Sequence, residues 1–245
     1  MISKLRTLWI ALISAIYMVD ICGRSVLKSR FSTSTREWVN KTLRNWAKRT
    51  LNLIGVKCVV INPYNVAPQP GTPTIIMCNH SSLYDIPISL QAFPDSSVRM
   101  LTKKEMYKWP IIGKGMVAAE FPFIDRHNRS QAMKDLEIMQ KLLQSGIVLW
   151  VAPEGTRSRD GKLAQFKKGS FITAITTKAT IIPIGIRGAH DILPARTYRF
   201  NLNQTAEIHI GQAIDAAEYT LENKEELIRR VFDAIHELAG QKTKD

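Results

Sequence analysis

A histidine and an aspartate, His80 and Asp85, stand five residues apart directly after the apolar run 74–78, which is typical of a buried strand. On one continuous helix this spacing would place the two side chains about 140° apart, and they would not meet. If His80 instead lies in a turn, and Ser81 or Ser82 caps a helix whose first turn carries Asp85, the carboxylate can reach back to the imidazole. The spacing is therefore compatible with a His/Asp pair.

Such a pair has the composition of a general base. The carboxylate of Asp85 would accept a hydrogen bond from one ring nitrogen of His80 and stabilise the imidazolium, and the other nitrogen would take a proton from a hydroxyl group. The alternative is a local hydrogen bond without a catalytic role, which is the commoner meaning of a histidine near an aspartate. A second polar turn, residues 153–158 (PEGTRS), follows another apolar run, 147–152. Two polar turns at two strand ends favour the catalytic interpretation, because ligands gather at the carboxyl ends of strands in an open α/β sheet.

Four blocks of this sequence resemble those of the glycerolipid acyltransferases of the lysophosphatidic acid acyltransferase type. In order, they are residues 79–85 (NHSSLYD), 123–126 (FIDR), 153–158 (PEGTRS) and 182–184 (IPI). Residues 103–106 (KKEM) and 110–113 (PIIG) resemble the segment between the first two blocks of the family, and the third block continues into 166–169 (FKKG). The order and rough spacing agree with the family from about residue 75 to residue 186, so the resemblance covers the central part of the chain.

The resemblance implies transfer of a fatty acyl chain from acyl-CoA or acyl carrier protein to the 2-hydroxyl of 1-acylglycerol-3-phosphate. The product would be phosphatidic acid, made in phospholipid biosynthesis by direct attack, without an acyl-enzyme and with no cofactor besides the acyl donor. These motifs do not fix the acceptor, so another lysophospholipid or lyso-lipid stays open. A thioesterase that uses water, or a non-catalytic lipid-binding protein with a vestigial dyad, would be an alternative from a different class.

Arginines in the second and third blocks suit an anionic acceptor. The guanidinium groups of Arg126 and Arg157 could bind a phosphate in a bidentate manner, although surface salt bridges are the alternative. Gly155 would let backbone amides approach the same anion. Glu154 could orient one of these arginines or bind a glycerol hydroxyl, and by resemblance it belongs to the acceptor site. The expected catalytic residues are His80 and Asp85, and the expected substrate-binding residues are Lys103, Arg126, Glu154, Gly155, Thr156 and Arg157, with no metal ligands.

Charge is unevenly distributed along the 245 residues. The net charge is +13, and residues 1–57 hold eleven Lys or Arg against two acidic residues. Nucleic acid is one candidate partner, but the sequence contains no zinc-finger spacing, no RNP-type aromatic pattern and no basic helix joined to a zipper. An anionic membrane surface fits better, since each Lys or Arg near it contributes about 1 kcal/mol to binding.

The three widely spaced cysteines argue against a disulfide framework and fit a reducing compartment.

The N-terminal segment is the expected membrane contact. Its apolar run, residues 9–19, extends to 5–22 if Arg6 and Asp20 are tolerated, so whether it spans the membrane or lies in it stays open. A signal peptide is the alternative, but a small-x-small cleavage pattern is missing. Residues 35–53 form a basic amphipathic pattern with two tryptophans, which suits the headgroup region or packing on the domain behind it. In a bacterium this would place the protein on the cytoplasmic face of the inner membrane.

From residue 56 onward, strand patterns alternate with helix patterns, which indicates an α/β fold with a largely parallel sheet flanked by helices. We therefore expect two parts, membrane-associating helices over 1–55 and an α/β acyltransferase domain over 56–245. The expected strands are 57–61, 74–78, 98–102, 121–124, 147–152, 180–186 and 207–210. The expected helices of the second part are 84–93, 104–119, 130–144, 168–178 and 221–239.

Overall fold

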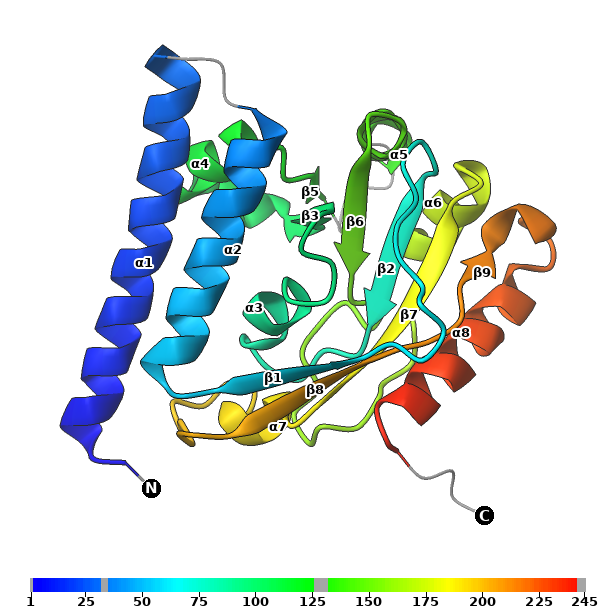
Figure 1. Cartoon of the computed structure of the whole chain (residues 1–245). Coiled ribbons are helices and arrows are strands. Elements are labelled where there is room, and N and C mark those ends of the chain that lie inside the picture. The colour runs from blue at the N-terminus through cyan, green and yellow to red at the C-terminus, as the bar shows by residue number, and fades with distance from the viewer. Residues whose placement is uncertain (1, 32–34, 126–131, 242–245) are drawn as a thin grey trace.

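The computed structural model describes residues 2–31, 35–125 and 132–241, and within them one mixed sheet is enclosed by helices (Figure 1). The sheet has the order β1-β8-β7-β2-β6-β3, with β9 paired to β7, and β4 pairs with β5 in a separate ribbon. The strands are β1 Lys57–Ile61, β2 Thr74–Cys78, β3 Ser97–Met100, β4 Thr102–Lys103, β5 Phe123–Ile124, β6 Ile147–Val151, β7 Thr180–Arg187, β8 Thr205–Ile210 and β9 Ile214–Asp215. The helices are α1 Lys4–Phe31, α2 Arg36–Leu53, α3 Asp85–Ser89, η1 Lys104–Lys108, α4 Ile112–Ala118, α5 Ala132–Gln144, α6 Gly169–Thr176, α7 Ala189–Ile192, η3 Ala216–Glu218 and α8 Lys224–Leu238.

Parallel pairing at the centre of the sheet brings several strand ends to one edge. Strands β3, β6, β2 and β7 run in the same direction, and every residue of β2 and β6 is buried. Strands β8 and β9 pair with β7 in the antiparallel sense. The predicted α/β class with a largely parallel sheet is therefore confirmed, and the carboxyl ends of β2 and β6 lie side by side.

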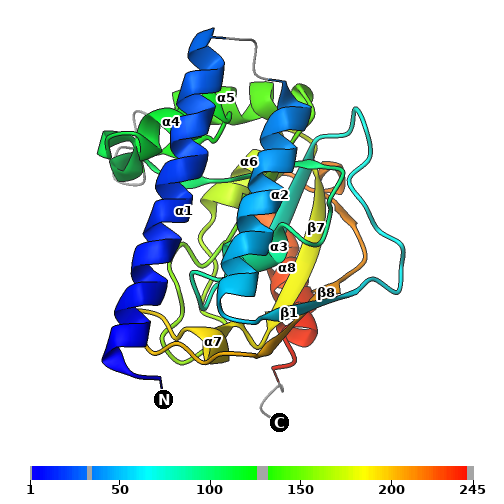
Figure 2. The same ribbon diagram turned by 60° about the vertical axis from the view of Figure 1, so that its left-hand side comes forward.

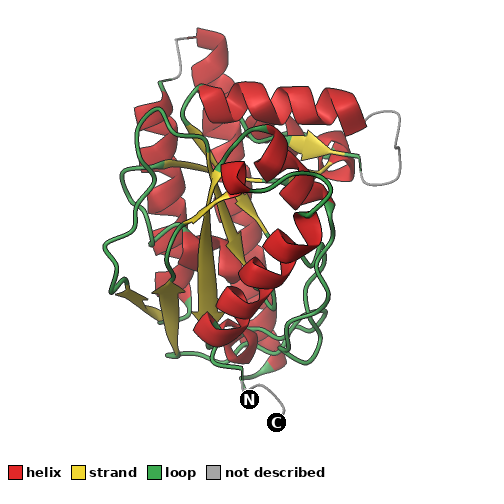
Figure 3. Ribbon diagram, turned by 90° about the vertical axis from the view of Figure 1, so that its right-hand side faces the viewer, coloured by secondary structure: helices red, strands yellow, loops and turns green. Residues whose placement is uncertain are grey.

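Side chains along the central strands point alternately to the two faces of the sheet, so the core is divided into two layers. Ile76, Val148 and Ile182 face the layer that contains the buried residues of α1 and α2. Their sequence neighbours face the layer that contains α5, α6 and α8 (Figure 3). Figure 2 shows α1 as the outermost helix, with α2 on one side of it and α4 on the other. Buried side chains of α1 and α2 belong to the same hydrophobic cluster as those of the sheet. The division of the chain into separate parts at residue 55 stays a prediction.

Prolines and short turns account for the main errors in the predicted elements. The single helix expected over 104–119 is wrong, because the 3₁₀-helix η1 ends before Pro110 and α4 begins after it. The helix expected over 84–93 is limited to α3, and Tyr84, rather than Ser81 or Ser82, is its N-cap residue. The strand expected over 98–102 divides into β3 and β4, and the short elements α7 and β9 were not predicted.

The N-terminal apolar segment belongs to a longer helix than its composition indicates. Helix α1 has 28 residues and is long and apolar enough to cross a membrane, by length and composition only. Helix α2 begins as expected, since the side chain of Thr35 caps it by accepting a hydrogen bond from the backbone amide of Trp38.

Candidate active site

The imidazole of His80 and the carboxylate of Asp85 meet after the end of β2. Their Nδ1 and Oδ2 atoms are 2.7 Å apart. His80 lies in the turn and Asp85 is the first residue of α3, so the turn geometry expected from the sequence brings the pair together. Because Nδ1 faces the carboxylate, Nε2 is the ring nitrogen left to exchange a proton with a substrate.

Asp85 is held by more than the imidazole. The same Oδ2 atom accepts hydrogen bonds from the backbone amides of Ser81 at 2.7 Å and Ser82 at 2.8 Å, and the residue is completely buried. Its second oxygen, Oδ1, has no hydrogen-bond partner among the described residues. The backbone amides of Ser81 and Ser82 therefore orient the carboxylate of Asp85. Because both amides are directed at this carboxylate, they do not point at a substrate oxyanion.

The turn that carries His80 is tied to the third block. The backbone carbonyl of His80 accepts from the amide of Ser158 at 2.7 Å, and its own amide donates to Oε1 of Glu154 at 2.8 Å. The ring of His80 makes an edge-to-face contact with Trp150, with ring centroids 5.8 Å apart. These contacts fix both the backbone and the ring of the histidine.

Glu154 is buried beneath this turn, with only 2% of its surface exposed. Its second oxygen, Oε2, accepts from the backbone amide of Ala164 at 2.8 Å. Burial raises the pKa of Glu154, while the hydrogen bonds from Ala164 and His80 act in the opposite direction. Each carboxylate oxygen of Glu154 thus accepts a hydrogen bond from a backbone amide of the protein. The expected role of Glu154 in binding the acceptor stays a prediction.

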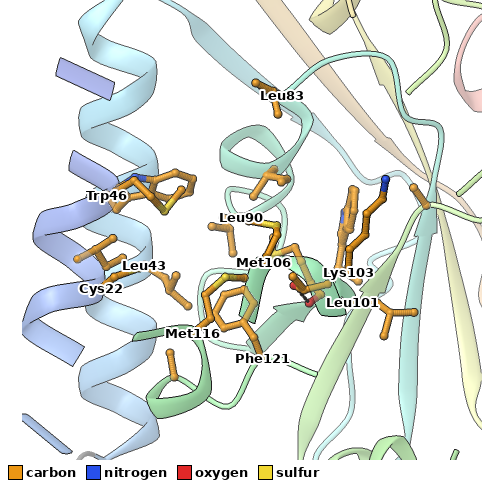
Figure 4. A pocket seen from close by; sticks show the side chains of 18 of the residues that line it. Cys22, Leu43, Trp46, Leu83, Leu90, Leu101, Lys103, Met106, Met116 and Phe121 are labelled. Carbon is orange, nitrogen blue, oxygen red and sulfur yellow. Dashed lines mark hydrogen bonds between the residues drawn. The ribbon is translucent and has the colours of Figure 1, made fainter. Parts of the chain in front are cut away.

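An apolar cavity of about 440 Å³ opens beside the His/Asp pair (Figure 4). It lies between α1 and α2 on one side and the sheet on the other, and it has the size of a small-molecule site. Trp46, Leu83, Leu90, Met116 and Phe121 are among the side chains directed toward it in Figure 4. The cavity forms where separate helices pack over the sheet, so residues that are far apart in the sequence line it together.

Three cationic side chains line the same cavity as His80. They are Lys103, Arg157 and Arg196. Among the residues that the structure describes, none of these three forms a salt bridge. Arg196 was missed by sequence reasoning, since it lies in an irregular loop after α7 and outside every recognised block. Within the described part of the chain, positive charge without a salt bridge therefore lines the cavity that also contains His80.

The other predicted substrate-binding residues differ in position. Gly155 and Thr156 line the cavity, and the φ angle of Gly155 is +76°, a conformation that suits glycine. Arg126 lies outside the described residues. A second cavity, of about 510 Å³, lies against α5 and α6, and five residues line both cavities: Leu101, Val151, Ala152, Gly155 and Thr156. The end of β6 and the start of the third block therefore lie between the two spaces.

The family of this chain follows from a comparison with protein-family models. Residues 57–187, more than half of the chain, match the family described as Acyltransferase. The chain belongs to the acyltransferase family. The matched residues include the His/Asp pair and the whole third block, so the family assignment covers the site described above. The resemblance seen in the sequence is confirmed.

Named proteins similar to this acyltransferase carry related descriptions. A protein of Cocos nucifera described as "1-acyl-sn-glycerol-3-phosphate acyltransferase" is 29% identical over 74% of this chain and 62% of its own length. A protein of Borreliella burgdorferi with the same description is 29% identical over 76% of this chain and 74% of its own. This acyltransferase thus spans less than two thirds of the length of the first of these relatives.

One solved structure matches nearly the whole of this acyltransferase. It is the 1-acyl-sn-glycerophosphate (LPA) acyltransferase PlsC from Thermotoga maritima, with a TM-score of 0.77 and 25% sequence identity. The match covers 98% of this chain and 97% of the other. The arrangement of the two N-terminal helices and the sheet therefore belongs to a fold that has been solved before.

Proposed function

We propose that this acyltransferase moves a fatty acyl chain from acyl-CoA or acyl carrier protein to the 2-hydroxyl of 1-acylglycerol-3-phosphate, giving phosphatidic acid. One observation carries the proposal: the half-buried His80, paired with the buried Asp85, lines an apolar cavity whose walls include three cations without a salt bridge among the described residues. An apolar chain, an anionic headgroup and a hydroxyl that must lose a proton would each meet a suitable group there. The descriptions of the relatives agree with this substrate.

The chemistry begins at the free ring nitrogen. In the proposed step, Nε2 of His80 removes the proton from the 2-hydroxyl while the hydroxyl oxygen attacks the carbonyl carbon of the thioester. The tetrahedral intermediate then loses its C–S bond, and the departing sulfur takes the proton back from the imidazolium. Asp85 stabilises that imidazolium through the 2.7 Å contact with Nδ1. A general base of this kind contributes about 10²–10⁴ in rate.

Substrate positioning is assigned to the cavity and its cations. Burial of an acyl chain in the apolar cavity would contribute about 0.8 kcal/mol per CH₂. Arg157, together with Lys103 and Arg196 in the lining of the same cavity, would hold the phosphate so that the hydroxyl meets His80. The second cavity beyond Gly155 gives room for part of a second long substrate. The expectation that Arg126 joins this phosphate site remains part of the proposal.

We place the reaction at a membrane surface. Helix α1 exposes large apolar side chains such as Leu8, Leu12 and Ile16, and it borders the cavity through Met18, Ile21 and Cys22. A lipid acceptor would enter from the bilayer. In a bacterium this proposal corresponds to the cytoplasmic face of the inner membrane.

An acceptor panel tests the proposed function. Purified protein in detergent receives labelled long-chain acyl-CoA together with 1-acylglycerol-3-phosphate, lysophosphatidylcholine, glycerol-3-phosphate or no acceptor, and both lipid product and free thiol are measured. We expect phosphatidic acid with the first acceptor and little product with the others. If lipid product forms with lysophosphatidylcholine alone, that lipid is the acceptor and the proposed acceptor is wrong. Thiol release without any acceptor would identify a thioesterase.

A further inference from the structure

Residues 103–117 carry large apolar side chains on their outer surface. This segment comprises the end of β4, the 3₁₀-helix η1, the turn after it and most of α4. Tyr107, Trp109, Ile111 and Val117 are exposed by 59%, 57%, 46% and 49%. Aromatic residues of this size are usually buried in a protein that meets only water, and contiguous apolar exposure marks an interaction site. We call residues 103–117 the outer lobe.

Positive charge accompanies these side chains. The outer lobe contains four lysines and one acidic residue, Glu105. Lys104, Lys108 and Lys114 are exposed, and Lys104 has a salt-bridge partner, Asp125 at 3.4 Å. Tryptophan and tyrosine beside lysine form the composition that favours the boundary between lipid headgroups and acyl chains. The chemistry of the surface thus fits an anionic lipid bilayer.

The backbone holds this surface outward at a conformational cost. Ile111 has φ +64° and ψ −56°, and the amide of Ile112 donates to the carbonyl of Pro110 at 2.6 Å. These values describe the rarer, strained form of the γ-turn, which is especially unfavourable for a β-branched residue. A Cβ atom added at Gly113 would lie 2.1 Å from the carbonyl oxygen of Tyr107, so η1 and α4 are in close contact. The hydrogen bond between Ile112 and Pro110 and the close contact of Gly113 with Tyr107 hold the turn in this conformation, with Ile111 at the surface.

The outer lobe is continuous with the N-terminal helix. A Cβ atom added at Gly115 would lie 2.5 Å from the Cα atom of Cys22, so α4 and α1 touch through their backbones, and Figure 2 shows them side by side. On its inner side the lobe contributes Met106 and Met116 to the cavity beside His80 (Figure 4). The exposed apolar surface and part of the cavity wall are thus the two sides of one segment.

We propose that the outer lobe is a second membrane-docking surface, which rests on an anionic bilayer beside α1. The charge of the lobe, its exposed tryptophan and tyrosine and its contact with α1 favour lipid over a soluble protein partner. The proposal does not depend on which acceptor is acylated, because its readouts are vesicle contact and binding rather than activity.

A site-specific fluorescent label tests the contact directly. In a Cys58→Ser background, which removes the half-buried cysteine and leaves the buried Cys22 and Cys78, Trp109→Cys carries an environment-sensitive nitrobenzoxadiazole label. Vesicles of phosphatidylcholine and phosphatidylglycerol should shift its emission to the blue, and brominated acyl chains should quench it. The same label at Leu221→Cys, exposed next to α8 on the far side of the sheet, should not respond.

A third label position makes the result decisive. Trp9→Cys on the exposed face of α1 reports whether the protein has bound the vesicles at all. If the label at position 9 responds and the label at position 109 stays in water, the proposal is wrong. A response at position 109 to an acidic acyl carrier protein but not to vesicles would also overturn it, and would assign the surface to a protein partner.

Charge removal gives a second, independent test. Lys108→Gln combined with Lys114→Gln should weaken binding to anionic vesicles by up to about 30-fold, from about 1 kcal/mol per lysine near the surface and 1.4 kcal/mol per tenfold. The matched control, Lys178→Gln with Arg229→Gln, removes two exposed charges beside α6 and on α8, in the layer across the sheet from α1 and α2. Equal vesicle affinity of the two double variants would contradict the proposal.

Discussion

The carboxylate of Glu154 and the backbone amide of His80 form a 2.8 Å hydrogen bond across 74 positions of sequence. The other oxygen of Glu154 accepts from the amide of Ala164, and the side chain is buried. A residue that the sequence assigns to the acceptor site thus contacts the backbone of the proposed base. We infer that Glu154 positions His80.

Glu154→Gln should therefore impair both stability and turnover. A glutamine side chain has one acceptor oxygen, so its NH₂ group would face one of the two backbone N–H donors. Leaving a buried donor unpaired costs about 1–3 kcal/mol of the free energy of unfolding. Denaturant unfolding and kcat measure the effect, with Glu226→Gln, an exposed glutamate, as control. Unchanged stability together with a raised acceptor KM alone would support acceptor binding instead.

Asp85→Asn should lower kcat while the protein stays folded. The asparagine could still accept from the amides of Ser81 and Ser82, but it would carry no charge to stabilise the imidazolium of His80. We expect a loss of about 10²–10⁴ in rate, the range of general-base catalysis. Single-turnover rates and circular dichroism test this together. A folded variant with activity within a few-fold of the wild type would remove Asp85 from the mechanism.

Arg157→Ala and Arg196→Ala should each raise the KM for the acceptor more than they lower kcat. Hydrogen bonds to charged groups contribute about 1.5–3 kcal/mol, which corresponds to about 10–100-fold in affinity. Steady-state kinetics with 1-acylglycerol-3-phosphate and acyl-CoA varied in turn distinguish the two substrates. Arg229→Ala, exposed on α8, is the control. If the KM for acyl-CoA alone changes, the cations bind the donor and not the acceptor.

The ion pair between Arg36 and Glu120 should make stability depend on acid pH. The side chains meet at 2.8 Å, and the hydrogen bond from Arg36 holds the pKa of Glu120 below its ordinary value of 4.5. A carboxyl group with a lowered pKa stabilises the folded state above its unfolded pKa, and this contribution is lost as pH falls through the folded value. The difference in unfolding free energy between wild type and Glu120→Gln should therefore be largest near neutral pH and disappear in acid. A difference that is constant with pH would show that the charge of Glu120 does not contribute to stability.

Local patterns account for the parts that the sequence predicted correctly. The turn between β2 and α3 could be placed because an apolar strand ends at Cys78 and Asp85 lies five positions after His80. Long-range contacts account for what was missed. Nothing near Glu154 in the sequence indicates that its oxygens bond the amides of His80 and Ala164, and Arg196 belongs to no recognised block. The helix expected over 104–119 failed because the pattern of apolar residues outweighed Pro110, which ends the first part of that segment.

The most direct test of the central claim compares wild type with His80→Ala. Both proteins, matched by circular dichroism and melting temperature, receive labelled acyl-CoA and 1-acylglycerol-3-phosphate, and phosphatidic acid and free thiol are measured over time. We predict that wild type releases one thiol per phosphatidic acid formed and that His80→Ala is slower by about 10²-fold or more. A folded His80→Ala protein that forms phosphatidic acid at the wild-type rate would contradict the assignment of His80 as the base.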